Sequence, residues 1–598
     1  MTLSLGGPMP LSNHRLQKSH LDLLYRGQGS AELTHELRIT EFSRRLLIVK
    51  SVTDLLTGRP EFLGNLPPAA HALDLLQKVD DDDRDIIRDV LLHPQVGAWA
   101  AYLMRRSLGF VESDAPLWVD AGVLHAVAFV AAVRHGHDWT TLIPARDGQA
   151  MLPGLGAAVF PAHTRWTVVE AETHAGEVTL RCGGTVIRRP VDGEAPADDT
   201  GWRELRQLSL GTDPALNVTL DDLDPFRDLG DPAEPRRLPR AEADRWTALT
   251  AGAWEILCTT HRTSAQAMAS AILSIVPLAD DGGNVTRSAS TGEAFGSVLV
   301  SEPYDARSLA VALVHEHAHI QLGALLHLLP VTTGGDDEIF YAPWRDDPRG
   351  FPGFVQGIYA FVNIAGFWRD EARAHHDVVA EFEYLHARRQ AELAISVAAA
   401  SGRLTEVGTQ LIARLADRVA GWSGDITTGA PFHAAGVVTD RHRAGWRIRH
   451  LTPAPESIGP LATAWSRGDP APLLDPGYHV VAGDKRWSQG QLALARRWAT
   501  RGDATPTPRL RALGVDDADA ALLAGEKPTA TARYARRIID DSGDLDAWSG
   551  LSVALDGPAG RTLAEHPSLV RAIHAGTDDF VKDPVALAAW LSQTWHDR

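Results

Sequence analysis

The feature that most constrains the fold is an apolar segment, residues 309–326, that carries two histidines four positions apart. Its apolar periodicity predicts a largely buried helix, with Asp305 as the N-cap. The segment contains an H-E-x-x-H motif made by His315, Glu316 and His319. Residues four apart share one helical face, so the two histidines can bind one metal ion. Glu316 is turned by about 100° from His315 and can reach metal-bound water without being a ligand.

Not every histidine of this segment is expected to bind metal. His317 is turned away from the pair, and His327 lies two turns beyond His319. We therefore predict that His317 and His327 are structural. An H-E-x-x-H motif also arises by chance in long chains, so the alternative for the pair itself is two partly buried structural histidines.

A strand is predicted directly before this helix, over Phe295 to Ser301. In zinc peptidases, a strand in this position binds extended peptide along its edge. If the outer edge is open, we expect the backbone of Val298 and Val300 to pair with a peptide substrate. The contiguous apolar residues equally suit a strand that lies inside a sheet.

The remaining pattern predicts a mainly α protein with a smaller β part. We expect an N-terminal helical region over residues 1–150 and a small antiparallel sheet over 151–235. A zincin-like H-E-x-x-H catalytic core is expected over 236–425, and a C-terminal helical, TPR-like region over 426–598. The length of 598 residues favours two to four domains.

Composition narrows the classes of partner and compartment. The net charge of −18 argues against nucleic acid as the main partner. The start of the chain lacks an apolar core for export, and no run approaches the roughly 18 apolar residues of a membrane span, so we expect a cytoplasmic protein that does not bind membranes. Two cysteines without a C-x-x-C motif exclude a structural zinc site built from thiolates.

One acidic segment outside the motif, Val218 to Asp228, carries four aspartates. Such a cluster can indicate a metal site. The segment lacks the spacing of an EF-hand, however, and Asp224-Pro225 is typical of a turn. We predict a structural turn.

Several segments together resemble a known family. These are HEHAHIQLGALLHLLP, YAPWRDDPR and GFVQGIYAFVNIAGFWR, supported by HPQVGAWA, LDDLDPFRD, GEAFGSVLVS, WRIRHLTP and DAWSGLSVAL. They are similar to the HExxH-motif putative peptide-modification family, and the similarity covers most of residues 14–575. Its members are bacterial proteins, free-standing or fused to radical SAM cyclophane synthases, and are also described as α-ketoglutarate-dependent H-E-x-x-H peptide β-hydroxylases of RiPP biosynthesis.

The resemblance implies an oxidoreductase, a dioxygenase that uses Fe(II), 2-oxoglutarate and O2 to hydroxylate the β-carbon of a residue in a ribosomally made precursor peptide. A radical SAM maturase is an implied partner. Non-haem iron oxygenases use two histidines and a carboxylate and leave open positions on the metal. The distal carboxylate of 2-oxoglutarate needs a cation, and Arg345 and Arg349 are the candidates.

The third metal ligand is left open by the sequence. Glu371 and Gln356 lie on a predicted apolar helix from Pro352 to His375. Glu371 is the better ligand chemically, whereas Gln356 is better placed among the family-like residues. The family often carries histidine near positions 356 or 361, where this chain has Gln356 and Phe361. Glu338 has the spacing of one class of zinc peptidases but does not open a helix.

Two further functions fit the same motif. One is a zinc metallopeptidase in which His315 and His319 bind the metal and Glu316 is the general base. The other is a non-catalytic, peptide-binding partner of a modifying enzyme. Metal content and peptide cleavage distinguish these functions from the hydroxylase.

Overall fold

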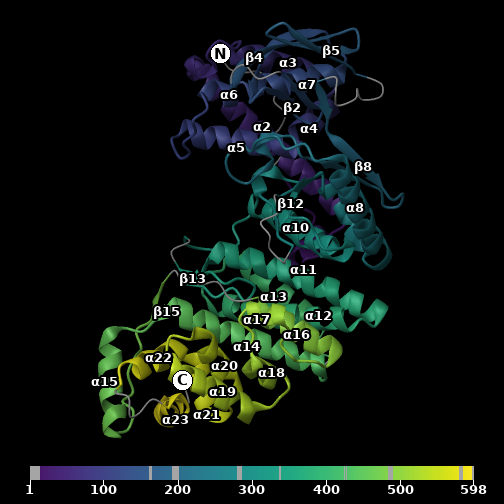
Figure 1. Cartoon of the computed structure of the whole chain (residues 1–598). Coiled ribbons are helices and arrows are strands. Elements are labelled where there is room, and N and C mark those ends of the chain that lie inside the picture. The colour runs from purple at the N-terminus through teal and green to yellow at the C-terminus, as the bar shows by residue number, and fades with distance from the viewer. Residues whose placement is uncertain are drawn as a thin grey trace. The chain divides into compact units, whose positions relative to one another are not determined.

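The computed structural model describes residues 14–160, 165–191, 201–278, 286–335, 338–422, 424–425, 427–481, 489–577 and 583–595. The chain divides into two compact units (Figure 1). The first unit comprises Met1–Leu24 and Gln28–Leu328, and the second comprises Tyr25–Gly27 and Leu329–Arg598. About 60% of the residues are helical and a smaller part forms sheets, which confirms the mainly α class. The division after Leu328 falls inside the region 236–425 that was expected to be one core.

Helices dominate the start of the first unit, as predicted. They are α1 (Lys18–Tyr25, which ends at the boundary of the two units), α2 (Ala31–Gly58), η1 (Pro60–Leu63), α3 (Ala69–Asp82), α4 (Arg84–Leu91), α5 (Pro94–Ser107), α6 (Leu117–Ala121) and α7 (Val123–His135). Helix α7 is buried along most of its length because its sequence is apolar on all sides. Gly136 ends it in the left-handed conformation, at φ 78°.

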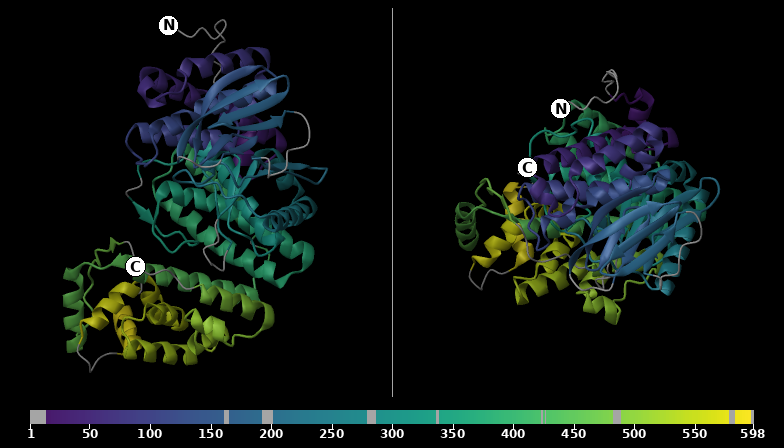
Figure 2. Two further views of the ribbon diagram at one scale, coloured as in Figure 1. Left: turned by 45° about the horizontal axis from the view of Figure 1, so that its top comes forward. Right: turned by 90° about the horizontal axis from the view of Figure 1, so that it is seen from above.

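A seven-stranded antiparallel sheet follows α7, which packs on it (Figure 2). Its strands are β1 (Trp139–Arg146), β2 (Gln149–Leu152), β3 (Gly156–Val159), β4 (Trp166–His174), β5 (Glu177–Cys182), β6 (Thr185–Pro190) and β7 (Trp202–Glu204), in the order β6-β5-β4-β1-β2-β3-β7. Asp147-Gly148 turns β1 into β2 with positive φ at both residues, which is the Asp-Gly signature of a tight hairpin. An antiparallel sheet was predicted here, but it begins at Trp139, earlier than the expected residue 151.

A second, mixed sheet positions the H-E-x-x-H helix. Its strands are β8 (Arg206–Leu210), β9 (Leu216–Leu220), β10 (Ser274–Pro277), β11 (Ser288–Ala289) and β12 (Ser297–Val300), in the order β11-β12-β10-β9-β8. The elements inserted between these strands are η3 (Pro225–Arg227), α8 (Arg240–Thr260), α9 (Arg262–Ala271) and η4 (Gly292–Ala294). β9, β10 and β12 run parallel. After β12, the chain leaves the sheet and continues into α10 (Ala306–Leu326).

The second unit is built almost entirely of helices. They are α11 (Phe351–His375), α12 (Val378–Ala400), α13 (Glu406–Ala420), α14 (Ala430–His450), α15 (Pro455–Arg467), α16 (Gly490–Arg501), α17 (Pro508–Ala512), α18 (Asp517–Leu523), α19 (Lys527–Asp540), α20 (Leu545–Ala554), α21 (Gly557–Glu565), α22 (Pro567–Ala575) and α23 (Pro584–Trp595). Two short pairs of strands complete it, β13 (Ile339–Phe340) with β14 (Arg349–Gly350) and β15 (Leu451–Thr452) with β16 (His479–Val480).

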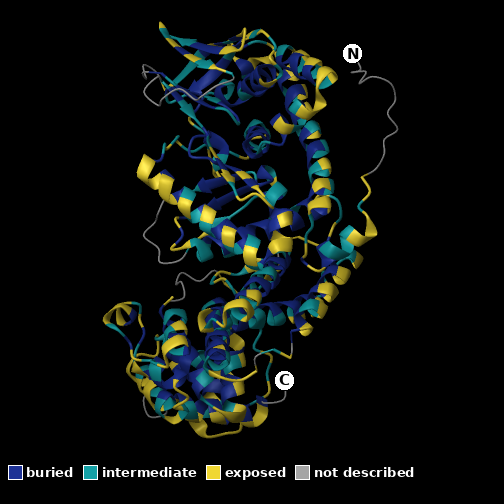
Figure 3. Cartoon of the chain, turned by 90° about the vertical axis from the view of Figure 1, so that its right-hand side faces the viewer, coloured by how far each residue is buried: buried dark blue, intermediate teal, exposed yellow. Residues whose placement is uncertain are grey.

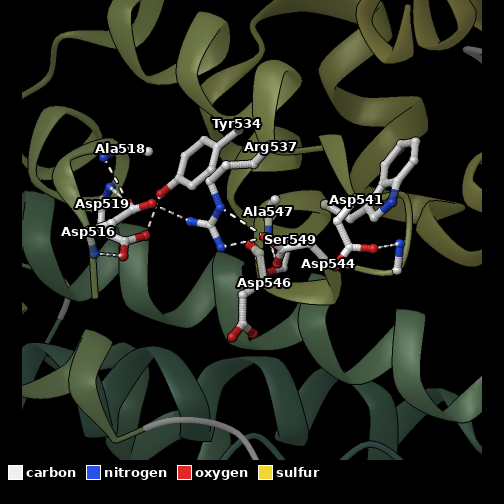
Figure 4. A network of polar contacts seen from close by, with 12 residues as sticks. Asp516, Ala518, Asp519, Tyr534, Arg537, Asp541, Asp544, Asp546, Ala547 and Ser549 are labelled. Atoms are coloured by element: carbon white, nitrogen blue, oxygen red, sulfur yellow. Dashed lines mark hydrogen bonds and ion pairs between the residues drawn. The ribbon is translucent and has the colours of Figure 1, made fainter. Parts of the chain in front are cut away.

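A polar network joins α14, α18 and α19 inside this unit (Figure 4). Asp519 accepts hydrogen bonds from the Tyr534 hydroxyl, at 2.6 Å, and from the Arg441 guanidinium. Arg537 pairs with Asp516 and Asp544, each at 2.7 Å. We call these residues the Asp519 network. Each carboxylate in it pairs with a guanidinium.

Two helical segments are long and apolar enough to cross a membrane by length and composition, Leu117–His135 and Ala306–Leu326. Within the most apolar stretch of 18 residues, 78% of the first segment and 67% of the second are buried in the protein. Figure 3 shows such buried residues in dark blue in the interior of each unit. Burial of this extent is typical of core helices.

Candidate metal site

Helix α10 begins where the sequence predicts. The Asp305 carboxylate accepts a hydrogen bond from the backbone N–H of Ser308 at 2.7 Å, which satisfies one of the free donors of the first turn. Most of the helix is buried, including Leu309, Leu313 and Leu322. Packing against α8 and against the sheet therefore holds the helix rigidly in place.

The two histidines of the motif lie one turn apart and face each other. Nε2 of His315 is 3.1 Å from Nε2 of His319, and the ring centroids are 4.8 Å apart. Neighbouring nitrogen ligands on a metal at about 2.0–2.1 Å are separated by a similar distance. Burial lowers the pKa of His315 to about 4, so its imidazole is neutral near pH 7, the form that binds metals. The pair fits two adjacent positions of one metal ion.

Glu316 lies on the other side of the His315 ring. Its carboxylate is fully buried, and Oε2 accepts a hydrogen bond from the Ser290 hydroxyl at 2.6 Å. Oε1 is 3.5 Å from Nδ1 of His315, and the Ser288 hydroxyl is also 3.5 Å from this nitrogen. A carboxylate at Nδ1 stabilises the tautomer that leaves Nε2 free for a metal.

The two serines were not identified from the sequence. Ser288 is in β11, and Ser290 directly follows this strand of two residues. Serine in a polar stretch carries no periodic signal, and only the pairing of β11 with β12 brings these hydroxyls to α10. No local sequence pattern would have indicated their role.

His317 is also buried, with 6% of its surface exposed, and burial lowers its pKa to about 4. Its Nε2 has no hydrogen-bond partner among the described residues. That His317 is not a ligand stays a prediction.

The expectation that Val298 and Val300 offer an open edge to a peptide is wrong. β12 is paired on both sides, with β10 in parallel and with β11 in antiparallel orientation. Both valines are fully buried. Among the described residues, the outer strands of this sheet are β11, next to β12, and β8 at the opposite edge. The run of apolar residues thus reflects a strand inside the sheet, the alternative that the sequence left open.

The other residues predicted for the site belong to the second unit. The guanidinium of Arg345 makes two hydrogen bonds to Asp347, at 2.9 and 3.0 Å. Arg349 is exposed, and its guanidinium lies over Gly353 in the first turn of α11, where a Cβ atom would be 2.5 Å from Nε. Both arginines are therefore placed near the start of α11.

The candidates for the third ligand differ in burial. Glu371 on α11 is 1% exposed, and its carboxylate is 4.0 Å from Nε2 of His375. Gln356 is half-buried on the same helix. Glu338 is half-exposed and forms an ion pair with Arg403.

No protein-family model matches this chain, and no curated protein matches it.

Proposed function

We propose that this chain is an Fe(II)- and 2-oxoglutarate-dependent hydroxylase that acts on the β-carbon of a residue in a ribosomally made precursor peptide. The observation that carries the proposal is the separation of 3.1 Å between Nε2 of His315 and Nε2 of His319 on the rigid helix α10. Two imidazoles at this distance suit a divalent transition metal. The resemblance of the surrounding segments selects iron and 2-oxoglutarate over zinc and water.

His315 and His319 would hold the metal, and a carboxylate is the preferred third donor. Glu371 remains the stronger chemical candidate and Gln356 the weaker, because a neutral amide oxygen donates less charge. The cofactor set supplies one chemistry when bound: O2 is split, one oxygen atom enters the β-C–H bond of the peptide, and 2-oxoglutarate is converted to succinate and CO2.

Glu316 acts as a positioning residue in this proposal. Its buried carboxylate lies 3.5 Å from Nδ1 of His315 and is itself held by Ser290, and a carboxylate beside Nδ1 favours the tautomer whose Nε2 is free for the metal. A general base of a zinc peptidase instead needs to approach the water on the metal, on the Nε2 side. The location of Glu316 at Nδ1 therefore supports the hydroxylase over the peptidase.

A cation for the distal carboxylate of 2-oxoglutarate is still required, and Arg349 is the better of the two candidates. Arg345 is already paired with Asp347 and would have to exchange that partner. We expect Arg349→Ala to raise the KM for 2-oxoglutarate while iron affinity is unchanged. Arg345→Ala and Asp347→Ala are the matched comparison, and unchanged KM in all three variants eliminates both arginines.

The open edge that a peptide would use moves from β12 to β11. The Ser301 N–H donates to the Arg287 carbonyl. Because antiparallel bonding alternates, the N–H and C=O of Ser288 then point away from β12 and are available to an extended peptide. We expect Ser288→Pro to weaken peptide binding, because proline removes the outward donor. Ser288→Ala keeps that donor and controls for loss of the hydroxyl near His315.

The proposal is tested by co-expression with a precursor peptide encoded beside the gene for this chain, and by anaerobic reconstitution of the protein with Fe(II). We expect an added oxygen atom in the peptide and succinate that forms only with His315 and His319 intact. A zinc-loaded protein that cleaves the peptide, and is inactive as Glu316→Gln, would establish the peptidase. Binding of the peptide by a protein that retains no metal would establish a non-catalytic partner.

A further inference from the structure

A second set of metal-ligand side chains lies outside the H-E-x-x-H motif, in the first unit. His93 directly precedes α5, and Asp221 and Asp224 follow β9. One ligand atom from each residue lies within 4.8 Å of the other two. Asp221 is fully buried and Asp224 is 2% exposed. We call these three residues the buried cluster.

The turn predicted around Asp224 accounts for only half of the carboxylate oxygens. Oδ1 of Asp221 accepts the N–H groups of Leu223 and Asp224, at 3.1 and 3.0 Å. An oxygen of Asp224 accepts the N–H of Phe226 at 2.8 Å and caps η3. Oδ2 of Asp221 and Nε2 of His93 are buried and have no hydrogen-bond partner among the described residues. The turn therefore leaves one carboxylate oxygen of Asp221 and one ring nitrogen of His93 unsatisfied.

In the same segment, the charge of the neighbouring Asp222 is neutralised by two ion pairs. Asp222 pairs with Arg206 at 2.6 Å and with Arg237 at 3.3 Å. The nearest guanidinium that acts on Asp224, that of Arg227, instead donates to the backbone carbonyls of Asp224 and Glu234, at 2.8 and 2.6 Å. Among the described residues, Asp221 and Asp224 therefore lack the direct ion pairs that neutralise Asp222.

A proton shared within the cluster would be the simplest way to remove this charge. Burial, and after it the charge of Asp221, raises the pKa of Asp224 to about 8, so a proton could be held there at neutral pH. A shared proton forms a short O–H···O or O–H···N contact, however. Oδ2 of Asp221 and Nε2 of His93 make no such contact with any described residue.

From this geometry we infer that His93, Asp221 and Asp224 bind a divalent transition-metal ion, Zn²⁺ in the first place. One imidazole and two carboxylates are donors that suit Zn²⁺, and an imidazole disfavours Mg²⁺ and Ca²⁺. Zinc ligands at about 2.0–2.2 Å from the metal are separated by less than 4.8 Å, so small rotations of the side chains would close the shell.

Room for a water molecule is present beside Asp224, the one member of the buried cluster that lines a cavity there. The volume of this cavity is about 30 Å³, enough for a water molecule. Gln95 and Gln149 also line it, and each directs a buried Oε1 atom that has no partner among the described residues. A metal-bound water could donate to these oxygens. The ion would then tie the start of α5 to the turn after β9 and stabilise the first unit.

The test uses the full chain with zinc alone, in the background His315→Ala/His319→Ala so that the motif cannot contribute. We expect one tightly bound zinc per chain by mass spectrometry of the metal content, and a melting temperature that zinc raises. Adding Asp221→Asn/Asp224→Asn should weaken zinc binding by at least about 100-fold and abolish the shift. Asparagine keeps the oxygen that accepts the backbone N–H groups, and if that variant does not fold, His93→Gln makes the same test.

A second group, formed by the exposed Asp82 and the half-buried His135 and His137, provides a control, because it has the same kinds of ligand. His135→Ala/His137→Ala should leave the bound zinc unchanged. The inference is overturned if the His315→Ala/His319→Ala background retains no zinc and shows no shift, or if only the surface variant loses the metal. Neither result bears on hydroxylation, which depends on the other site.

Discussion

The Asp519 network of the second unit and the buried cluster of the first unit both place carboxylates in the interior, but they neutralise them differently. Asp519 is 1% exposed and faces Arg441 and Tyr534. Burial alone would raise its pKa, yet Arg441 and Tyr534 lower the pKa of Asp519 below its usual value. In the buried cluster, burial prevails and the pKa of Asp224 rises to about 8.

This contrast distinguishes polar groups with a structural role from polar groups that can bind a ligand. A buried acid with a guanidinium partner is complete, and its role is to hold helices together. In the buried cluster, by contrast, Oδ2 of Asp221 and Nε2 of His93 have no hydrogen-bond partner among the described residues, and a cation there would satisfy them. The His315 and His319 rings also approach each other, with their Nε2 atoms 3.1 Å apart.

The largest effect is expected from breaking the Asp519 network. Arg441→Met leaves the buried charge of Asp519 unmatched and should destabilise α18 to α20 by about 3–5 kcal/mol. Hydrogen exchange of the backbone amides of these helices measures the loss. The double variant Arg441→Met/Asp519→Asn should recover most of it.

An exposed pair supplies the control for this comparison. Arg536 pairs with Asp540 at 3.3 Å, with 77% and 62% of the side chains exposed. Arg536→Met should change stability by less than about 1 kcal/mol. Equal losses of stability in Arg441→Met and Arg536→Met would contradict the view that a buried ion pair contributes more to stability than an exposed one.

His125 in the first unit is a buried histidine whose Nε2 has a hydrogen-bond partner, unlike Nε2 of His93. Nε2–H of His125 donates to the Pro67 carbonyl at 2.8 Å, and burial lowers the pKa of His125 to about 4. Its folded pKa is below the unfolded value of 6.5, so its contribution is present above about pH 6.5 and is lost as pH falls towards 4. At about 1.4 kcal/mol per pH unit, the loss approaches about 3 kcal/mol.

Unfolding of the chelator-treated protein between pH 7 and pH 4 measures this contribution. His125→Gln keeps an N–H donor but does not titrate, so it should flatten the pH dependence. We also expect added zinc to leave the contribution of His125 unchanged, since this histidine already has its partner. An unchanged slope in His125→Gln would assign the pH dependence to other groups.

A smaller effect is expected from Glu316→Gln. Loss of the carboxylate at Nδ1 of His315 should weaken metal binding by about 10–100-fold. Ser290→Ala removes only the hydrogen bond to Glu316 and should weaken it less. Isothermal titration of Fe(II) under anaerobic conditions measures both, and Glu302→Gln, which alters an exposed acid paired with Arg245, is the control. Full metal affinity in Glu316→Gln with loss of peptide cleavage would favour a general base.

Local patterns in the sequence were sufficient for α10 and for the pairing of its histidines. The period of apolar residues, the cap at Asp305 and the i, i+4 spacing all act within one helix, so no tertiary information was required. The strand before α10 was likewise predicted from its apolar run, as β12.

Contacts between distant segments could not be predicted in this way. Whether β12 is an edge depends on β11, a strand of two residues, Ser288–Ala289, that has no hydrophobic signature. The aspartates after β9 were read correctly as a turn, but their approach to His93 depends on how α5 packs. The third ligand was left open because donors on α11 are separated from the motif by many residues.

Metal binding by the full chain with single substitutions in α10 tests whether His315 and His319 hold the metal. We predict that His315→Ala and His319→Ala each lose the iron that the parent protein binds under anaerobic conditions, whereas His317→Ala retains it. Melting curves of all three variants confirm that they are folded. Loss of iron in a folded His317→Ala variant, with iron retained in His315→Ala, would contradict the assignment of the metal to the convergent histidine pair.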